Sequence, residues 1–448
     1  MTVHEPTPAP EASAPAQAPV DVRQAASVVS GLSPSQPVKR NGGLTAVGVV
    51  GIAVLGLVGL AVIAYLFAGL GPTAFAIGGF LALVPLGIVL LGVHWIDRWE
   101  PEPRGILVFA FLWGAAASVA VALIVGAQLD VVLAAISGDS TTRDFLASVV
   151  EAPIVEEGAK GLGLLLIFWF ARKHFDGPID GLVYAAWVAG GFAFTENILY
   201  FGVQLLTAGT VDGGLVEIFI ARGIMSPFAH VMFTACTGVA LGFASQKKGW
   251  LPGIGFFFIG LVPAVLLHAL WNGSSFIVEG LGGFFIVYAL VQVPLFALAI
   301  VAVVFLRKRE AALTRVRLDE YAAAGWFTPE EVAMLSTGTG RRQARTWAKA
   351  QGGDKGTVMR RFTQDATRLA FARQRVVTGR DGIGGRRDEA DLLQAVSTDR
   401  AMLLSTGPQA PVQGSYSPPA ADPYSPPAAD LYSSPSSQQP PQQGPPVI

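Results

Sequence analysis

Seven polar side chains interrupt long apolar stretches of the chain, where ionisable groups are rare. Placing a charged side chain within a membrane-spanning helix costs roughly 2.5–3.5 kcal/mol on insertion scales, so such residues usually mark a functional site or a buried pair. Two histidines with one carboxylate can form a catalytic zinc shell, and a second carboxylate can take the proton of the attacking water. These residue types therefore predict hydrolysis of an amide bond. The seven are Glu156, Glu157, Lys160, Glu196, His230, His268 and Asn272.

The composition of the chain indicates that these residues lie in a membrane. Of 448 residues, 52% are hydrophobic and only 14% are charged, whereas a soluble domain is typically about 25% charged. Runs of roughly 20 apolar residues are long enough to cross a bilayer as helix, so we predict an all-α polytopic membrane bundle of about eight helices. The expected spans are 44–68, 73–95, 105–127, 145–171, 180–206, 214–245, 250–278 and 283–306.

The distribution of Lys and Arg predicts the orientation of these spans. Basic residues gather at alternate ends of the spans, and the intervening loops hold almost none apart from Arg143. The positive-inside rule then predicts a multi-pass protein of the bacterial cell membrane with both termini in the cytoplasm. Because some forty polar residues precede the first span, we do not expect that span to be a cleaved signal peptide.

Four regions are expected along the chain. Pro, Ala, Ser and Gln dominate the first region and Pro, Ser and Tyr the last, so we predict both to be disordered. The third region has helical composition, and Thr328 with Glu331 forms a capping box that starts one helix. A small soluble cytoplasmic domain is favoured there over basic helices lying on anionic lipid headgroups. The regions are 1–42, the membrane domain 43–306, 307–410 and 411–448.

Several other classes of protein are excluded. A net charge of −1 gives no general field that would attract nucleic acid, and the single Cys236 excludes an internal disulfide framework or a CxxC metal knuckle. The chain has no HExxH motif, no GxGD motif and no GxSG motif with a partner histidine. The signatures of several other intramembrane hydrolases are therefore missing.

Depth within the membrane supports a single polar site. At 1.5 Å per residue, Glu157 lies roughly 18 Å and Glu196 roughly 15 Å below the outer surface, with His268 at about the same level. His230 is expected a few ångströms deeper if its span is unbroken, although Pro227 predicts a kink there. Four helices thus bring two carboxylates and two imidazoles to nearly one level.

Helix periodicity predicts which of these side chains share a face. Residues four apart lie on one face, so Glu156 is expected to pair with Lys160, and His268 to lie beside Asn272. Glu157 should point about 100° away from Glu156 and stay free for chemistry. In that arrangement, Asn272 could donate to a developing oxyanion.

In order, these motifs resemble those of the PrsW family of intramembrane proteases, which belongs to a superfamily with the CAAX prenyl proteases and the Aph-1 scaffold subunit of gamma-secretase. The resemblance covers about residues 44–306, and the later histidines lie in SPFAH and HALWN. The matching segments are DRWEPEP at Asp97–Pro103, EEGAK at Glu156–Lys160, FAFTEN at Phe192–Asn197, His230 and His268.

The resemblance implies roles for the seven residues. Glu157 would activate water with help from Glu156, and Lys160 and Asn272 would support them. Glu196, His230 and His268 would form the catalytic shell that binds a divalent metal, zinc by expectation. Substrates would be single-pass membrane proteins in the bilayer, anti-sigma factors among them.

Three alternatives stay open at this point. A purely glutamate-driven protease would need no metal. A non-catalytic scaffold of the Aph-1 type would use the same polar cluster to bind a partner helix. A proton- or cation-coupled transporter ranks last, because no internal repeat is visible between 44–171 and 180–306. The oligomeric state is left open.

Overall fold

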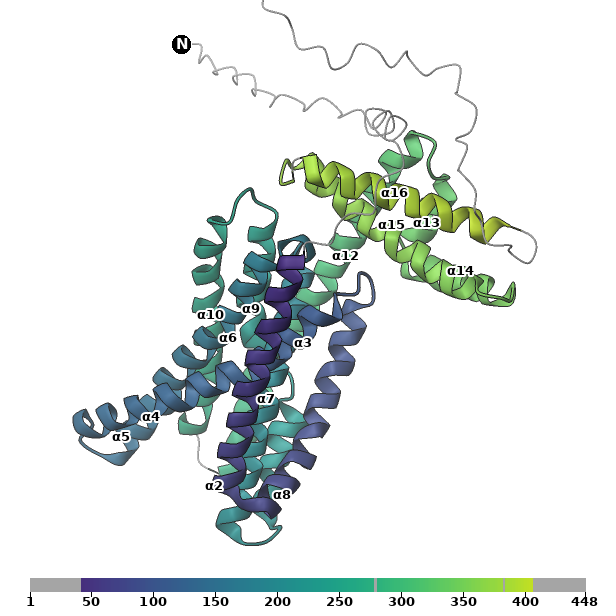
Figure 1. Ribbon diagram of the computed structural model, residues 1–448. Helices are drawn as coiled ribbons and strands as arrows, with labels where there is room; N and C mark the ends of the chain where they lie inside the picture. Colours follow the sequence, from purple (N-terminus) through teal and green to yellow (C-terminus); the bar gives the residue numbers. More distant parts are fainter. Residues whose placement is uncertain (1–41, 278–279, 382, 406–448) are drawn as a thin grey trace, which may run out of the picture. The chain divides into compact units, whose positions relative to one another are not determined.

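The computed structural model describes residues 42–277, 280–381 and 383–405, and these residues form helices and no strands (Figure 1). The predicted all-α helical bundle is therefore confirmed. The predictions of disorder for 1–42 and 411–448 lie outside the described residues, apart from Gly42 at the start of the first helix.

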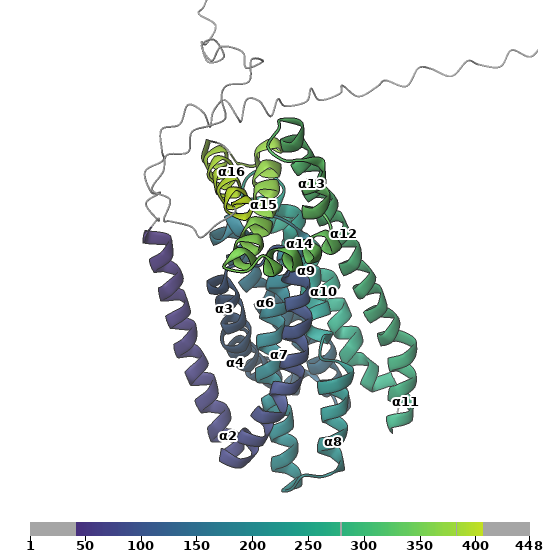
Figure 2. The ribbon, with the colours of Figure 1, turned by 90° about the vertical axis from the view of Figure 1, so that its right-hand side faces the viewer.

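The first described helix, α2 (Gly42–Asp97), contains the first two predicted spans. It is broken at Gly71, whose φ of 72° and ψ of 166° are not helical. Glycine reaches this region because it has no Cβ. Figure 2 shows the two limbs of α2 meeting at an angle at this break. A single glycine thus lets an apolar segment of 56 residues turn back on itself.

The remaining apolar elements follow the predicted order, with one difference in kind. Several helices contain a short π-helical turn, η1, η2, η4 or η5, in which the winding is locally wider. The chain is broken between η4 and α9 at Ser226–Phe228, which confirms the kink predicted at Pro227. The elements are α3 (Arg104–Leu112), η1 (Trp113–Ser118), α4 (Val119–Ile136), α5 (Ser140–Phe145), η2 (Leu146–Glu151), α6 (Ala152–Phe170), η3 (Arg172–His174), α7 (Pro178–Ala208), α8 (Gly213–Phe219), η4 (Ile220–Met225), α9 (Ala229–Ser245), α10 (Pro252–Ile277), α11 (Gly280–Val287), η5 (Tyr288–Gln292) and α12 (Val293–Ala323).

Among the described residues, six helical segments are long and apolar enough to cross a membrane. The difference from the expected eight has two sources. The segment Gly48–Asp97 holds two predicted spans on either side of its break, and α6 is not among the six. Helix α6 carries three charged residues within 19 positions, whereas each of the six segments has a stretch of 18 residues with at most two.

Helix α7 forms the centre of the bundle. It packs most extensively against α2 and α9, and most of its length is buried. Small residues allow this close approach: a Cβ added at Gly181 would meet the backbone carbonyl of Gly238 on α9, and the reverse also holds. The core beside this contact contains Phe168, Tyr184 and Leu241, each fully buried. Because α7 touches so many neighbours, its side chains can reach groups from several helices.

A helical region follows the bundle. Helix α12 runs without a break across the predicted boundary between 306 and 307. Thr328 and Glu331 form the predicted capping box at the start of the next helix, with Glu331 N donating to Thr328 Oγ1 at 3.2 Å. The helices are α13 (Pro329–Leu335), α14 (Gly338–Ala350), α15 (Lys355–Val377) and α16 (Ile383–Leu404).

The DRWEPEP segment is held at both of its ends. Glu102 N donates to Asp97 Oδ1 at 3.1 Å, and the buried Glu102 carboxylate accepts from Tyr184 Oη on α7. Burial and the nearby charge of Asp180 raise the pKa of Glu102 well above its ordinary value. From the other side, the Arg341 guanidinium stacks 3.4 Å from the centre of the Trp99 ring. This acidic loop therefore links the bundle to α14.

The break in α2 gives a first prediction. Gly71→Ala places a Cβ on a backbone conformation that only glycine adopts readily, so it should destabilise the protein by about 1–3 kcal/mol. Gly69→Ala is the matched control, because Gly69 is helical and a Cβ there meets nothing within 4 Å. Thermal unfolding of both variants in detergent checks this, and equal midpoints would contradict it.

Candidate active site

The centre of the candidate site is Lys160 on α6. Its ammonium nitrogen lies 2.8 Å from Glu157 Oε1 and 3.2 Å from Glu156 Oε2, and its side chain has no exposed surface. Glu157, which was expected to stay free for chemistry while Glu156 paired with Lys160, is therefore paired with Lys160 as well. Residues three apart on a helix are neighbours as well as residues four apart, and the long lysine side chain reaches both carboxylates.

Glu157 is fully buried and bonded from three directions. Its Oε1 atom also lies 3.2 Å from His268 Nδ1, and its Oε2 accepts a hydrogen bond of 2.8 Å from Thr234 Oγ1. Sequence reasoning missed Thr234, although it lies four residues after His230 and so shares its helix face. Helices α6, α9 and α10 are thus joined at one carboxylate.

His268 on α10 lies between the two glutamates. Its Nδ1 atom faces Glu157, and its Nε2 atom lies 3.9 Å from Glu156 Oε2. The Phe233 ring stacks on the imidazole with ring centres 4.9 Å apart and an angle of 21° between the planes. The stacked ring and the carboxylate together fix the orientation of this imidazole.

His230 lies near the start of α9, directly after the break at Pro227. Its Nε2 is 2.9 Å from Glu196 Oε2 on α7, and its Nδ1 is 3.2 Å from Lys160 Nζ. The rings of His230 and His268 lie 5.1 Å apart, nearly perpendicular to each other. The predicted convergence of two carboxylates and two imidazoles from four helices is therefore present in the structure.

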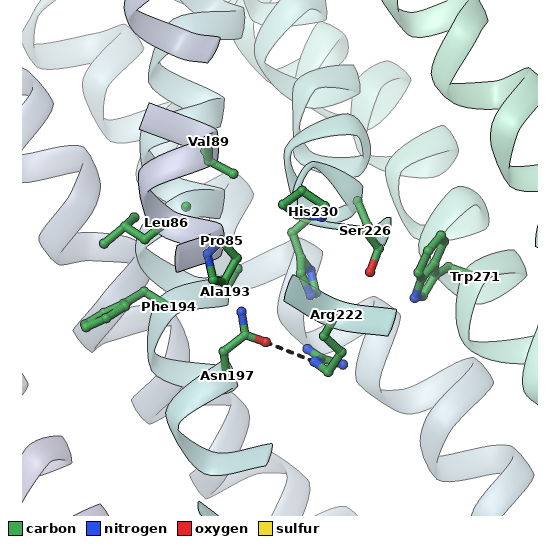
Figure 3. Close-up of a pocket in the computed structure, with 13 residues that line it drawn as sticks. Pro85, Leu86, Val89, Ala193, Phe194, Asn197, Arg222, Ser226, His230 and Trp271 are labelled. Atoms are coloured by element: carbon green, nitrogen blue, oxygen red, sulfur yellow. Dashed lines mark hydrogen bonds between the residues drawn. The ribbon is translucent and has the colours of Figure 1, made fainter. Parts of the chain in front are cut away.

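Glu196 has a second partner, Arg222, to which the sequence analysis gave no role in the site. Arg222, from the π-helical turn η4, pairs with Glu196 and donates from Nε to Asn197 Oδ1 at 3.0 Å. The same guanidinium lies 3.9 Å from the centre of the Tyr200 ring. Figure 3 shows Asn197 and Arg222 joined beside His230, where a hollow has room for roughly one water molecule. No local sequence pattern links residues 25 positions apart.

Three of the residues could hold a metal ion. One ligand atom from each of Glu156, His230 and His268 lies within 4.8 Å of the others. Each imidazole has its other nitrogen on a carboxylate, Glu196 for His230 and Glu157 for His268. Outer carboxylates of this kind orient metal-binding histidines in many proteins. The donor set therefore fits a divalent cation, with Glu156 in the place that the sequence prediction gave to Glu196.

Asn272 is directed elsewhere. Its Nδ2 atom donates to the backbone oxygen of Ser148 in η2 at 2.8 Å. This bond links α10 to the start of the α6 segment and so helps to position His268. The predicted role of Asn272 as an oxyanion donor stays a prediction.

The fold and the site define a class: a multi-pass helical membrane protein with a Glu/His/Lys cluster buried within its bundle. Comparison with known proteins shows the family. Residues 102–299 match the family described as PrsW family intramembrane metalloprotease, and the chain belongs to the PrsW family. All seven predicted residues lie within the matched segment.

Curated relatives agree with this assignment. The chain is 30% identical over 201 residues to protease PrsW of Clostridioides difficile (strain 630), covering 43% of this chain and 76% of the relative. It is 33% identical over 168 residues to protease PrsW of Geobacillus kaustophilus, which covers 36% of this chain and 66% of the relative. It is 29% identical over 192 residues to protease PrsW of Bacillus subtilis (strain 168), which covers 42% of this chain and 77% of the relative. No solved structure matches the chain.

The position of Lys160 gives a second prediction. Lys160→Met leaves two buried carboxylates without their shared cation, so it should destabilise the protein by about 3–5 kcal/mol. Lys173→Met is the control, because that side chain is 76% exposed. Thermal unfolding of both variants in detergent checks this. The double variant Lys160→Met/Glu156→Gln should recover part of the loss, and no loss in Lys160→Met would contradict the central place of this ion pair.

Proposed function

We propose that the chain is an intramembrane endopeptidase that hydrolyses peptide bonds of single-pass membrane proteins, an anti-sigma factor among them. The observation that carries the proposal is the buried Glu157 carboxylate, shared by Lys160, Thr234 and His268 beside a Glu/His/His donor set. The names of the relatives favour this activity over the scaffold alternative, because the curated relatives are proteases.

In the proposed mechanism, Glu157 takes the proton of the attacking water. A carboxylate oxygen has two lone pairs. Oε1 of Glu157 faces both Lys160 and His268, whereas Oε2 has only Thr234 among the described residues. Oε2 therefore keeps one lone pair without a partner among the described residues, and this is the atom that would take the proton. Lys160 and Thr234 hold this carboxylate in place so that it need not reorganise during the reaction.

Glu156, His230 and His268 would hold a divalent metal, for which we propose zinc. Glu196 faces Nε2 of His230 and Glu157 faces Nδ1 of His268, and these outer carboxylates would orient the two imidazoles toward the ion. Such an ion lowers the pKa of a bound water and polarises a carbonyl oxygen. In this arrangement Arg222 pairs with Glu196, and Glu196 in turn faces Nε2 of His230 and orients its ring.

The orientation proposed for the chain keeps both termini in the cytoplasm. It rests on the basic residues at alternate span ends, Arg98 and Arg307 among them. The site then lies near the midplane of the bilayer, because the depth estimate of roughly 15–18 Å is about half of a hydrocarbon core of about 30 Å. Substrates would reach it from the lipid phase near the outer surface.

The proposed base gives a third prediction. Glu157→Gln should lower cleavage by at least about 100-fold, because general-base catalysis contributes that much or more. The measurement compares new protein N-termini in membranes of cells that express the native chain or the variant at equal levels. Ends from single-pass proteins that vanish in the variant would identify the substrates.

Glu217→Gln serves as the control for this comparison, because Glu217 is an exposed carboxylate on α8 and is not one of the seven predicted site residues. It should leave the set of new ends unchanged. An unchanged set in folded Glu157→Gln would remove Glu157 as the base and favour the scaffold alternative.

The donor set gives a fourth prediction. The purified chain should carry one zinc per molecule, and His268→Gln should lower the metal content because one ligand is lost. Metal analysis of the protein measures this without reference to activity. A chelator should abolish cleavage, and added zinc should restore it. Full cleavage by metal-free protein would show that the glutamates act without a metal.

A further inference from the structure

A second group of charged residues lies at the end of α2, away from the Glu/His cluster. Arg98 directly follows the candidate span Gly48–Asp97, and it is exposed. Trp95 lies three residues earlier, and the Arg307 guanidinium stacks 4.1 Å from its ring centre. Tryptophan and arginine favour the boundary between hydrocarbon and water. The edge of the membrane therefore lies at this level, whichever side of the membrane it is.

Helix α14 is fixed against this edge. Arg341 donates from Nη1 to the backbone oxygen of Trp99 at 3.1 Å, besides stacking on the Trp99 ring. Trp99 Nε1 in turn donates to Thr314 Oγ1 on α12 at 3.4 Å. These contacts hold the next turn of α14, which carries Arg345, beside the chain that leaves the membrane at Arg98.

Arg345 lacks the nearby carboxylates that partly offset the cost of burying Arg341. Near Arg341, the carboxylates of Glu310 and Glu100 offset part of the cost of burial. Around Arg345, burial and then the charges of Arg98 and Arg360 lower the pKa of the guanidinium. In the part of the chain that the structure describes, Arg345, Arg98 and Arg360 form no ion pair, and the buried Nε atom of Arg345 has no hydrogen-bond partner.

A buried guanidinium donor without an acceptor on Arg345, with the like charges of Arg98 and Arg360 acting on it, is the feature of an anion site. We propose that Arg98, Arg345 and Arg360 bind the phosphate group of an anionic lipid headgroup at the membrane edge. Guanidinium groups suit phosphate because their fork of donors can engage two oxygens at once. The location selects a lipid rather than a free anion, because Arg98 directly follows a membrane-spanning segment. This site is independent of the proposed protease activity.

The test uses the full chain, purified in an uncharged detergent and stripped of lipid. Native mass spectrometry measures its affinity for dioleoyl-phosphatidylglycerol and dioleoyl-phosphatidylcholine, with inorganic phosphate as competitor. Each basic residue near a membrane surface contributes about 1 kcal/mol, so Arg345→Gln/Arg360→Gln should weaken phosphatidylglycerol binding roughly 30-fold. The choline lipid should bind more weakly to the native chain, and phosphate should not compete at equal concentration.

The matched control is Arg386→Gln/Arg387→Gln, which removes two exposed charges from α16. It should bind phosphatidylglycerol like the native chain. If Arg345→Gln/Arg360→Gln does not fold, Arg360→Gln alone changes an exposed residue and should weaken binding roughly fivefold. Equal losses in the test and control variants, equal affinity for both lipids, or displacement by phosphate at equal concentration would each overturn the proposal.

Discussion

The rest of the site depends on one buried cation. Lys160 lies between two carboxylates inside an apolar bundle, and neither the cation nor the Glu157 carboxylate has any exposed surface. Ions are costly to remove from water, and their attraction repays this cost only when their other bonds are made as well. The bonds of Glu157 to Thr234 and His268 provide this, since they satisfy the carboxylate from two more helices. The contacts that hold Glu157 in the site are therefore the same contacts that join α6, α9 and α10.

The bundle meets this constraint through small residues and local irregularities. Glycines at the contact between α7 and α9 bring the two backbones together, and further along α7 the Glu196 side chain pairs with His230 of α9. The π-helical turn η4 presents Arg222 to Glu196, and η2 supplies the backbone oxygen that holds Asn272. Such turns often occur at functional sites because they re-aim side chains without ending the helix. Two of the π-helical turns thus hold Arg222 and Asn272 at or beside the charged cluster.

Sequence patterns predicted what depends on local spacing or on helix rise. The capping box at Thr328 follows from four adjacent residues, and the common level of His230 and His268 follows from their distance to the span ends. Partners brought together by tertiary packing gave no such signal, as with Arg222 and Thr234. Glu157 was expected to stay free for chemistry, but it also pairs with Lys160. Helix spacing did not predict this, because a long lysine side chain reaches residues three as well as four positions away. The count of spans differed because α6 carries three charged residues, and because two predicted spans lie on either side of the break at Gly71 within one helical segment.

Helix α12 has a mechanical consequence. Its 31 residues form one rod about 46 Å long that begins among the membrane helices and ends beyond Thr314, the partner of Trp99. A rod with no joint transmits rotation and axial shift from one end to the other. Any force on the helical region after it is therefore felt by the last apolar segment of the bundle and by the acidic loop at Trp99. The edge of the membrane is crossed here by a rigid helix rather than by a flexible linker.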